Sequence, residues 1–133
     1  MPQIKAKVLH IGGEDVRMRI PILKKMIEKK YSVAAVGCGD QPAFKGTSIP
    51  YHDYHLKRSI SLLSDMFSKK ELSSIFLNEK PDLIHLFDTK PGVLTPKVAK
   101  YSGVKFVVRT VTGMGYIFSS NSIFIKILRP IYR

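Results

Sequence analysis

The sequence predicts an α/β fold with a doubly wound parallel sheet of the Rossmann-like type. Short apolar runs, which are typical of buried strands, alternate along the chain with segments whose apolar residues recur at helical spacing. The 133 residues, 44% of them hydrophobic, are enough for one domain with its own core but not for two. No internal repeat, low-complexity tract or linker interrupts the alternation. We therefore expect residues 1–133 to form a single domain.

The first strand and helix follow directly from the N-terminal pattern. Residues 7–11 (KVLHI) form a short apolar run that ends at Gly12-Gly13, which predicts a buried strand. Apolar side chains then recur on one helical face of residues 15–30. Pro21 should either bend this helix or mark the start of its regular part.

A second strand and a loop are predicted next. Residues 31–37 (YSVAAVG) form the strand, and residues 38–48 form a polar loop that contains glycine. Residues 49–51 are a candidate for a short third strand.

Two helices are predicted after this, over residues 59–67 and 68–79. Ser68 and Glu71 have the spacing of a capping box, which places a helix start at Ser68.

The remaining elements alternate in the same way. Residues 82–87 (DLIHLF) predict a strand, residues 95–102 a helix that stops at Gly103, and residues 105–111 (KFVVRTV) the most pronounced strand pattern of the chain. A loop over 112–115 and a basic amphipathic helix over 119–132 complete the order. Such a helix could lie in a membrane interface, or it could pack against the rest of its own protein.

This order of elements locates a ligand site without any reference to homology. In doubly wound sheets, ligands bind at the carboxyl ends of the strands, where the strand order reverses. With right-handed crossovers, that point lies between the strand at 7–11 and the strand at 82–87. The loops expected to line it supply the candidate acceptor-binding or phosphate-binding residues: Gly12, Gly13, Asp88, Thr89, Lys90, Thr112, Gly113 and Gly115.

Each of these loops also has a plain structural explanation. Gly12-Gly13 could bring backbone amides close to an anion at a helix N-terminus, or could simply form a tight turn. Lys90 could hold a phosphate or a sugar hydroxyl, and Thr89 could cap the next helix. The full G-x-G-x-x-G fingerprint, a Walker A sequence and zinc-ligand spacing are missing from the sequence, which disfavours a dinucleotide-dependent dehydrogenase.

The positions of the histidines and the cysteine predict neither a metal site nor a catalytic nucleophile. His52 and His55 flank Asp53, but no second cluster completes a metal coordination shell, so no metal is expected. His10 and His85 fall on predicted central strands, where a hydrogen-bonded core imidazole is the default expectation. A single cysteine, Cys38, excludes a disulfide framework and indicates an inert loop thiol.

The charge is strongly basic. Lys and Arg number 22 against 10 Asp and Glu, giving a net charge of +12. No carboxylate side chain follows Asp88, so the last third cannot supply an acid/base carboxylate pair. Such a surface attracts phosphates of a nucleotide, a nucleic acid or a lipid headgroup.

Three stretches resemble the N-terminal domain of family-4 glycosyltransferases, which have the GT-B fold: residues 16–33, 81–92 (PDLIHLFDTKPG) and 103–118 (GVKFVVRTVTGMGYIF). The resemblance is strongest to the bacterial enzymes that build O-antigen, capsule and other undecaprenyl-linked glycans. Many relatives carry histidines where this chain has Phe87 and Thr112, which argues against a histidine-assisted acceptor site.

The resemblance implies a retaining enzyme in which this domain binds a sugar acceptor on a polyprenyl diphosphate. A C-terminal domain, expected to lie outside these residues, would bind the nucleotide-sugar donor, a UDP-sugar, and no other cofactor is expected. The protein would work in the cytoplasm, peripherally on the anionic inner face of a bacterial membrane, and no nucleic acid is expected as partner. The residues alone also leave open a basic nucleic-acid-binding module and a stand-alone Rossmann-like interaction domain.

Overall fold

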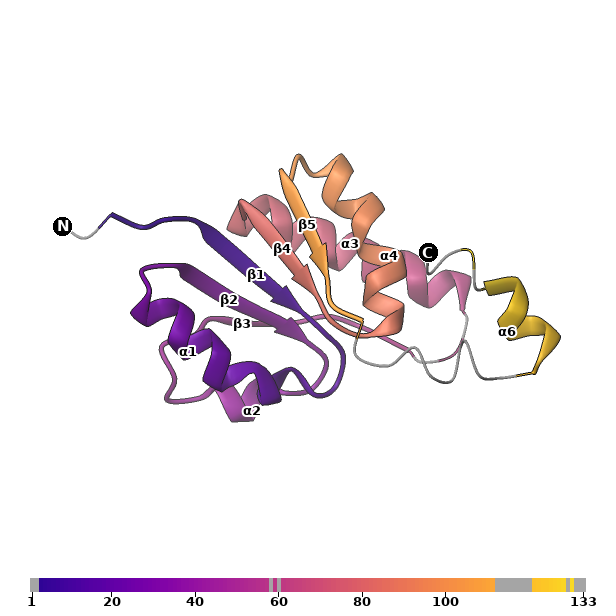
Figure 1. Ribbon diagram of the computed structural model, residues 1–133, viewed down its shortest axis with the longest axis horizontal. Coiled ribbons are helices and arrows are strands. Elements are labelled where there is room, and N and C mark those ends of the chain that lie inside the picture. Colours follow the sequence, from indigo (N-terminus) through magenta and orange to yellow (C-terminus); the bar gives the residue numbers. More distant parts are fainter. Residues whose placement is uncertain (1–2, 58, 60, 112–120, 129, 131–133) are drawn as a thin grey trace.

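The chain folds around a five-stranded parallel sheet of order β3-β2-β1-β4-β5 (Figure 1). The computed structural model describes residues 3–57, 59, 61–111, 121–128 and 130. The strands are β1 (Lys7–Ile11), β2 (Ser32–Gly37), β3 (Tyr51–Asp53), β4 (Leu83–Leu86) and β5 (Phe106–Arg109). The order reverses at β1, which pairs with β2 on one side and with β4 on the other. This confirms the predicted doubly wound topology and its switch point.

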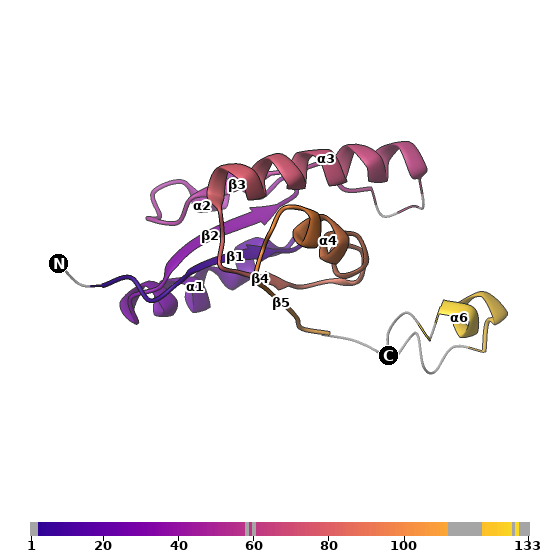
Figure 2. The ribbon, with the colours of Figure 1, turned by 90° about the horizontal axis from the view of Figure 1, so that it is seen from above.

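Helices cover both faces of the sheet, so successive residues of the central strand enter two separate cores. Figure 2 shows α1 (Ile20–Glu28) and α3 (Leu62–Glu79) on opposite sides of the sheet. Leu9 and Ile11 of β1 join the core that includes residues of α3 and α4 (Thr89–Tyr101), whereas Val8 joins the core under α1. This is the two-sided burial expected of a parallel strand.

Several predicted helix boundaries are wrong, each for a local reason. The helix predicted over 15–30 divides into a 3₁₀ turn (Val16–Arg19) and α1, because Pro21 at its first turn marks the start of the regular helix. The loop at 38–48 contains one short helix, α2 (Gln41–Phe44), which is too short to show periodicity. The short third strand lies two residues later than predicted, at β3.

The two helices predicted over 59–67 and 68–79 are a single helix, α3. Its N-cap is Ser61, whose hydroxyl accepts a hydrogen bond from the Ser64 amide. Ser68 is fully buried inside the helix, and its hydroxyl donates to the Ser64 carbonyl at 2.9 Å. The predicted capping box at Ser68 and Glu71 is therefore wrong, because a mid-helix serine can bond to the preceding turn instead.

The helix predicted over 95–102 begins six residues earlier, at Thr89. Pro91 is compatible with a first helical turn, since the amide it lacks has no intrahelical partner there. Pro96 lies inside the helix and cannot donate to the Gly92 carbonyl, which instead accepts a hydrogen bond from Arg109 at 3.4 Å. Asp88, not Thr89, occupies the N-cap position, so the predicted capping role of Thr89 is wrong.

The C-terminal part of the described chain carries apolar side chains that remain exposed. Strand β5 is the sheet edge, and Phe106, Val107 and Val108 are 62%, 40% and 45% exposed. The helix predicted over 119–132 is described only as α6 (Ile123–Leu128), whose Phe124 is also exposed. Among the described residues, no helix is long and apolar enough to cross a bilayer.

Candidate functional site

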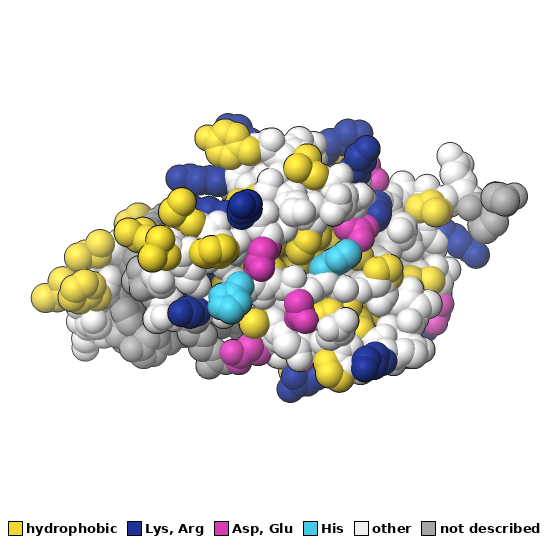
Figure 3. Space-filling view, turned by 180° about the vertical axis from the view of Figure 1, so that it is seen from behind, with side chains coloured by type: hydrophobic (Ala, Val, Ile, Leu, Met, Phe, Trp, Pro, Cys, Tyr) yellow, Lys and Arg dark blue, Asp and Glu magenta, His cyan; other side chains and the backbone are white. Residues whose placement is uncertain are grey.

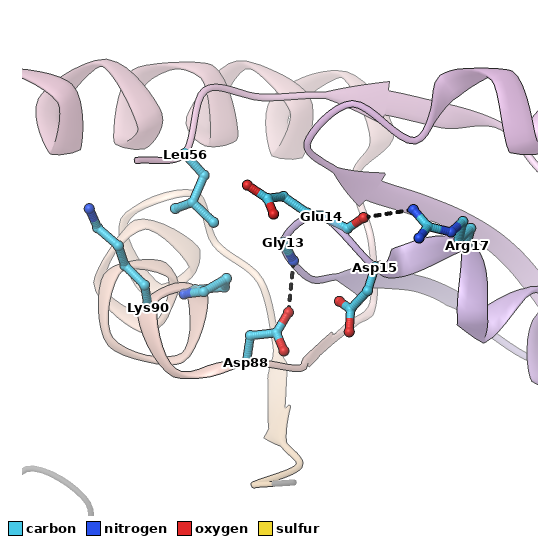
Figure 4. A pocket seen from close by; sticks show the side chains of 8 residues that line it. Gly13, Glu14, Asp15, Arg17, Leu56, Asp88 and Lys90 are labelled. Atoms are coloured by element: carbon cyan, nitrogen blue, oxygen red, sulfur yellow. Dashed lines mark hydrogen bonds between the residues drawn. The ribbon is translucent and has the colours of Figure 1, made fainter. Parts of the chain in front are cut away.

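A crevice opens at the carboxyl ends of β1 and β4, where the sequence places it. It has a volume of about 570 Å³ and lies between the loop after β1 and the start of α4 (Figure 4). Leu56, from the segment between β3 and α3, closes one side. The lining residues are Gly13, Glu14, Asp15, Arg17, Leu56, Asp88, Lys90 and Pro91.

The amides of the Gly12-Gly13 turn already have protein partners. Gly12 donates to the Val36 carbonyl at 3.0 Å, which continues the sheet beyond β1. Gly13 donates to Asp88 Oδ2 at 2.8 Å, joining the two loops of the crevice (Figure 4). A phosphate bound at the Gly13 amide would therefore have to replace the Asp88 carboxylate.

Asp88 has a backbone conformation that side-chain-bearing residues rarely adopt. Its φ is 71° and its ψ is 159°, in a region populated almost only by glycine. The side chain makes no capping bond to its own helix and reaches instead to Gly13. Strain of this kind costs on the order of 1–3 kcal/mol and is concentrated at functional sites. This strained backbone positions the Asp88 carboxylate that joins the loops after β1 and β4.

Lys90 is bound to protein groups of the crevice wall. Its ammonium group donates to the carbonyls of Lys57 and Ser59, the latter at 2.7 Å, and pairs with Asp65 at 2.8 Å. Both side chains of the ion pair are mostly buried, at 20% and 17% exposure. Lys90 thus connects the first turn of α4 to the start of α3.

The loop after β1 is anchored by an ion pair on the other side of the crevice. Arg17 donates to Asp40 Oδ1 at 2.8 Å and to the Glu14 carbonyl at 3.2 Å, while its backbone amide donates to Asp40 Oδ2 at 2.9 Å. Asp40 is almost fully buried. The crevice therefore presents carboxylates of Glu14, Asp15 and Asp88 on a fixed frame, a set that suits hydrogen bonds from sugar hydroxyls.

The remaining predicted residues are distributed as follows. Gly12 packs behind the crevice against Val16, and Thr89 begins α4. Thr112, Gly113 and Gly115 lie outside the described residues. Sequence reasoning missed Leu56 and Asp40, because they come from other loops and leave no local pattern beside Gly13 or Asp88. It also missed Arg17, because its ion pair with Asp40 joins positions 23 residues apart.

The His52 side chain is held by a neighbouring carboxylate, whereas His55 is exposed. His52 lies 2.5 Å from Glu79, which also pairs with Lys7 at 2.5 Å. Burial alone would raise the pKa of Glu79, but hydrogen bonds from Lys7 and His52 outweigh it and lower that pKa. Within the described part of the chain, no three His, Cys, Asp or Glu residues are grouped as a metal site.

The two strand histidines lie side by side on the α1 face of the sheet. His85 Nε2 is 2.7 Å from the Thr110 hydroxyl, as expected of a bonded imidazole. His10 is bonded at one ring nitrogen: its Nε2 lies 3.3 Å from the Met26 sulfur, a weak acceptor, whereas its Nδ1 has no hydrogen-bond partner among the described residues.

The two glycines of the turn should differ sharply in their tolerance of alanine. A Cβ at Gly12 would lie 2.7 Å from Cγ2 of the buried Val16, whereas a Cβ at Gly13 has its first neighbour at 3.4 Å. We expect Gly12→Ala to lower the free energy of unfolding by about 1–3 kcal/mol, since the core must shift. Gly13→Ala should change it by less than about 1 kcal/mol. Urea denaturation measures both, and equal losses would contradict this packing argument.

The comparisons with known proteins agree with the fold. A segment of 61 residues, 46% of this chain and 16% of the relative, is 39% identical to the UDP-Gal:alpha-D-GlcNAc-diphosphoundecaprenol alpha-1,3-galactosyltransferase of Escherichia coli. The chain therefore matches only a small part of this relative's length.

Solved structures share the architecture at low sequence identity. A putative UDP-N-acetylglucosamine 2-epimerase from Listeria monocytogenes superposes with a TM-score of 0.66 at 13% identity, covering 98% of this chain and 38% of that one. The SsfS6 glycosyltransferase of Streptomyces sp. SF2575 superposes with a TM-score of 0.59 at 15% identity, covering 94% of this chain and 44% of that one. These likenesses establish the fold, which is that of the N-terminal lobe of GT-B proteins.

Residues 7–133 match the family described as "Glycosyl transferase 4-like", almost the full length of the chain. This match agrees with the parallel sheet and the switch-point crevice described above. The chain therefore belongs to the glycosyl transferase 4-like family.

Proposed function

We propose that this chain is the acceptor-side domain of a retaining glycosyltransferase. The whole protein would move a sugar from a nucleotide-sugar, a UDP-sugar, to a glycan acceptor carried on a polyprenyl diphosphate, in the synthesis of a bacterial surface polysaccharide such as O-antigen or capsule. The donor would be bound mainly by a second domain outside residues 1–133. The observation that supports this most directly is the family match over residues 7–133.

The crevice supports a role in binding sugar. Its carboxylates can accept hydrogen bonds from acceptor hydroxyls, and Leu56 offers an apolar surface on which a sugar ring can pack. The matched relative in Escherichia coli is named for a diphosphoundecaprenol acceptor, which supports a lipid-linked substrate here. A net charge of +12 favours peripheral contact with the anionic inner face of the membrane, and we propose no nucleic-acid partner.

The proposal is tested with the full-length protein and a panel of UDP-sugars and polyprenyl-diphosphate acceptors. We expect transfer of labelled sugar to one acceptor, with retention of the anomeric configuration by NMR. Inversion would refute the retaining assignment, and absence of transfer across the panel would refute the acceptor class. Salt-sensitive binding to random duplex DNA, with no transfer, would favour the nucleic-acid module instead.

Lys90→Met should lower the stability of the protein, because Lys90 holds the wall of the crevice. The change leaves two backbone carbonyls and the mostly buried Asp65 carboxylate without their cation. We expect a loss of about 1–3 kcal/mol in unfolding free energy and a lower turnover in the full-length enzyme. Lys100→Met, at an exposed position of the same helix, is the matched control. Unchanged stability and kinetics in Lys90→Met would remove Lys90 from the site.

A further inference from the structure

The first two turns of α3 bury polar side chains and expose apolar ones. Ser64 and Ser68 face the core, at 7% and 0% exposure. The outward positions of the same turns carry large apolar side chains that are 65% to 81% exposed: Leu62, Leu63, Met66 and Phe67. We name these four residues the α3 apolar patch. Figure 3, seen from the α3 side, shows hydrophobic side chains gathered toward the end of the molecule where α3 begins and α6 lies.

The helix cannot rotate to bury this patch. Leu72 and Phe76, further along α3, are fully buried in the core and fix its orientation. The Ser68 hydroxyl lies within hydrogen-bond distance of the carbonyls of His55 and Ser64, and its single proton is shared between them, so Ser68 holds the segment that leads into the helix. Four adjacent exposed apolar side chains in a fixed position are typical of a contact surface.

A basic groove adjoins the patch one turn further along. It lies between α3 and α4, has a volume of about 360 Å³, and is lined by Lys69, Lys70, Lys97 and the 90% exposed Tyr101, among others. The carboxylates of the neighbouring turns are engaged elsewhere, Asp65 with Lys90 and Glu71 with the His55 amide. The groove therefore presents its lysines without a carboxylate among its lining residues.

Apolar side chains flanked by lysines and a tyrosine fit a lipid interface. The apolar groups enter the boundary of the acyl chains, the ammonium groups meet anionic headgroups, and tyrosine prefers the headgroup level. A second copy of the same surface would bring the lysines of both copies together and repel them. The charge therefore favours an anionic membrane over self-association.

The patch also lies beside the crevice. The start of α3 and the first turn of α4 are joined by the Lys90–Asp65 ion pair at 2.8 Å and by the bond from Lys90 to the Ser59 carbonyl. We propose that the α3 apolar patch and its lysine groove bind an anionic lipid surface, so that the crevice opens next to the membrane. This inference deepens the proposed function, because it names the surface that would bring the protein to a lipid-linked acceptor.

A tryptophan reporter tests the contact directly. This chain contains no tryptophan, so Phe67→Trp introduces a single indole within it. With vesicles of phosphatidylcholine and phosphatidylglycerol, we expect a blue-shifted emission and protection from an aqueous quencher. Leu77→Trp is the matched control, because Leu77 is 60% exposed on the same helix but lies about 15 Å further along its axis. The indole emission of the Leu77→Trp variant should not shift.

Charge substitutions separate the two parts of the surface. Leu63→Glu with Phe67→Glu should weaken vesicle binding at least about tenfold, because carboxylates replace the inserted groups. Lys69→Glu with Lys70→Glu should abolish the preference for anionic over neutral vesicles. Leu77→Glu should bind like the parent protein.

The outcomes distinguish this inference from the proposed function. Vesicle binding that is unaffected by the patch substitutions would overturn the inference, even if transfer to a lipid-linked acceptor is observed. Patch substitutions that change only the oligomeric state in sedimentation would overturn it in favour of a second copy. Binding that depends on the patch, in a protein that transfers no sugar, would support the inference and count against the function.

Discussion

Replacing Asp88 with alanine should both destabilise the domain and strongly reduce transfer by the full-length enzyme. Alanine keeps the strained backbone, at φ 71° and ψ 159°, but removes the carboxylate that accepts from the Gly13 amide at 2.8 Å. The buried amide then loses a charge-assisted bond, which costs on the order of 2 kcal/mol. The loops after β1 and β4 are no longer joined, so we expect at least about a tenfold lower kcat/KM.

Two further substitutions separate backbone strain from the hydrogen bond. Asp88→Gly also loses the bond but relieves the strain, so it should be about 1–2 kcal/mol more stable than Asp88→Ala. Asp88→Asn keeps an oxygen acceptor and has the same backbone strain as the parent aspartate, so it should stay within about 1 kcal/mol of the parent protein. Urea denaturation of the three variants measures the order Asn, Gly, Ala. A glycine variant less stable than the alanine variant would refute the strain argument.

The topology was predictable because the chain alternates strand and helix patterns of sufficient length. The runs at 7–11 and 82–87 place apolar side chains in the cores on both faces of the sheet, and this pattern locates the switch point. The boundary errors arise where tertiary packing overrides local signals. Ser68 resembles a helix cap in sequence, yet it is buried against His55, a contact that no local window contains.

The sequence predicted which loops line the crevice, but not the hydrogen bonds between them. Gly13, Asp88 and Lys90 lie in one crevice because parallel strands end at the same edge of the sheet. Gly13 bonds to Asp88, 75 residues away, and Lys90 bonds to Ser59, 31 residues away. Such distant partners could be identified only from the folded structure. The exposed α3 patch was hidden for a related reason: the sequence shows apolar residues at helical spacing but not which side faces the core.

Removing His10 should change the pH dependence of the stability between about pH 4 and pH 6.5. It is fully buried beside His85 and Phe87, with ring centroids 5.0 and 5.5 Å away. Burial, followed by the nearby His85 and Arg19, lowers the pKa of His10 from 6.5 to about 4. The unfolded chain therefore binds this proton more readily than the folded protein does. Stability should be highest above about pH 6.5 and should decline as the pH falls toward 4.

A pKa shift of this size lowers the free energy of unfolding by about 3 kcal/mol across that pH interval, since one pKa unit is about 1.4 kcal/mol. His10→Leu keeps an apolar group in the core and removes the titration, so it should be about 2 kcal/mol more stable than the parent protein at pH 4.5. At pH 7 the two should lie within about 1 kcal/mol, because the variant also removes the unpartnered Nδ1. His55→Gln is the control, because it removes an exposed imidazole. If His10→Leu keeps the parental pH profile, the acid sensitivity does not originate at His10.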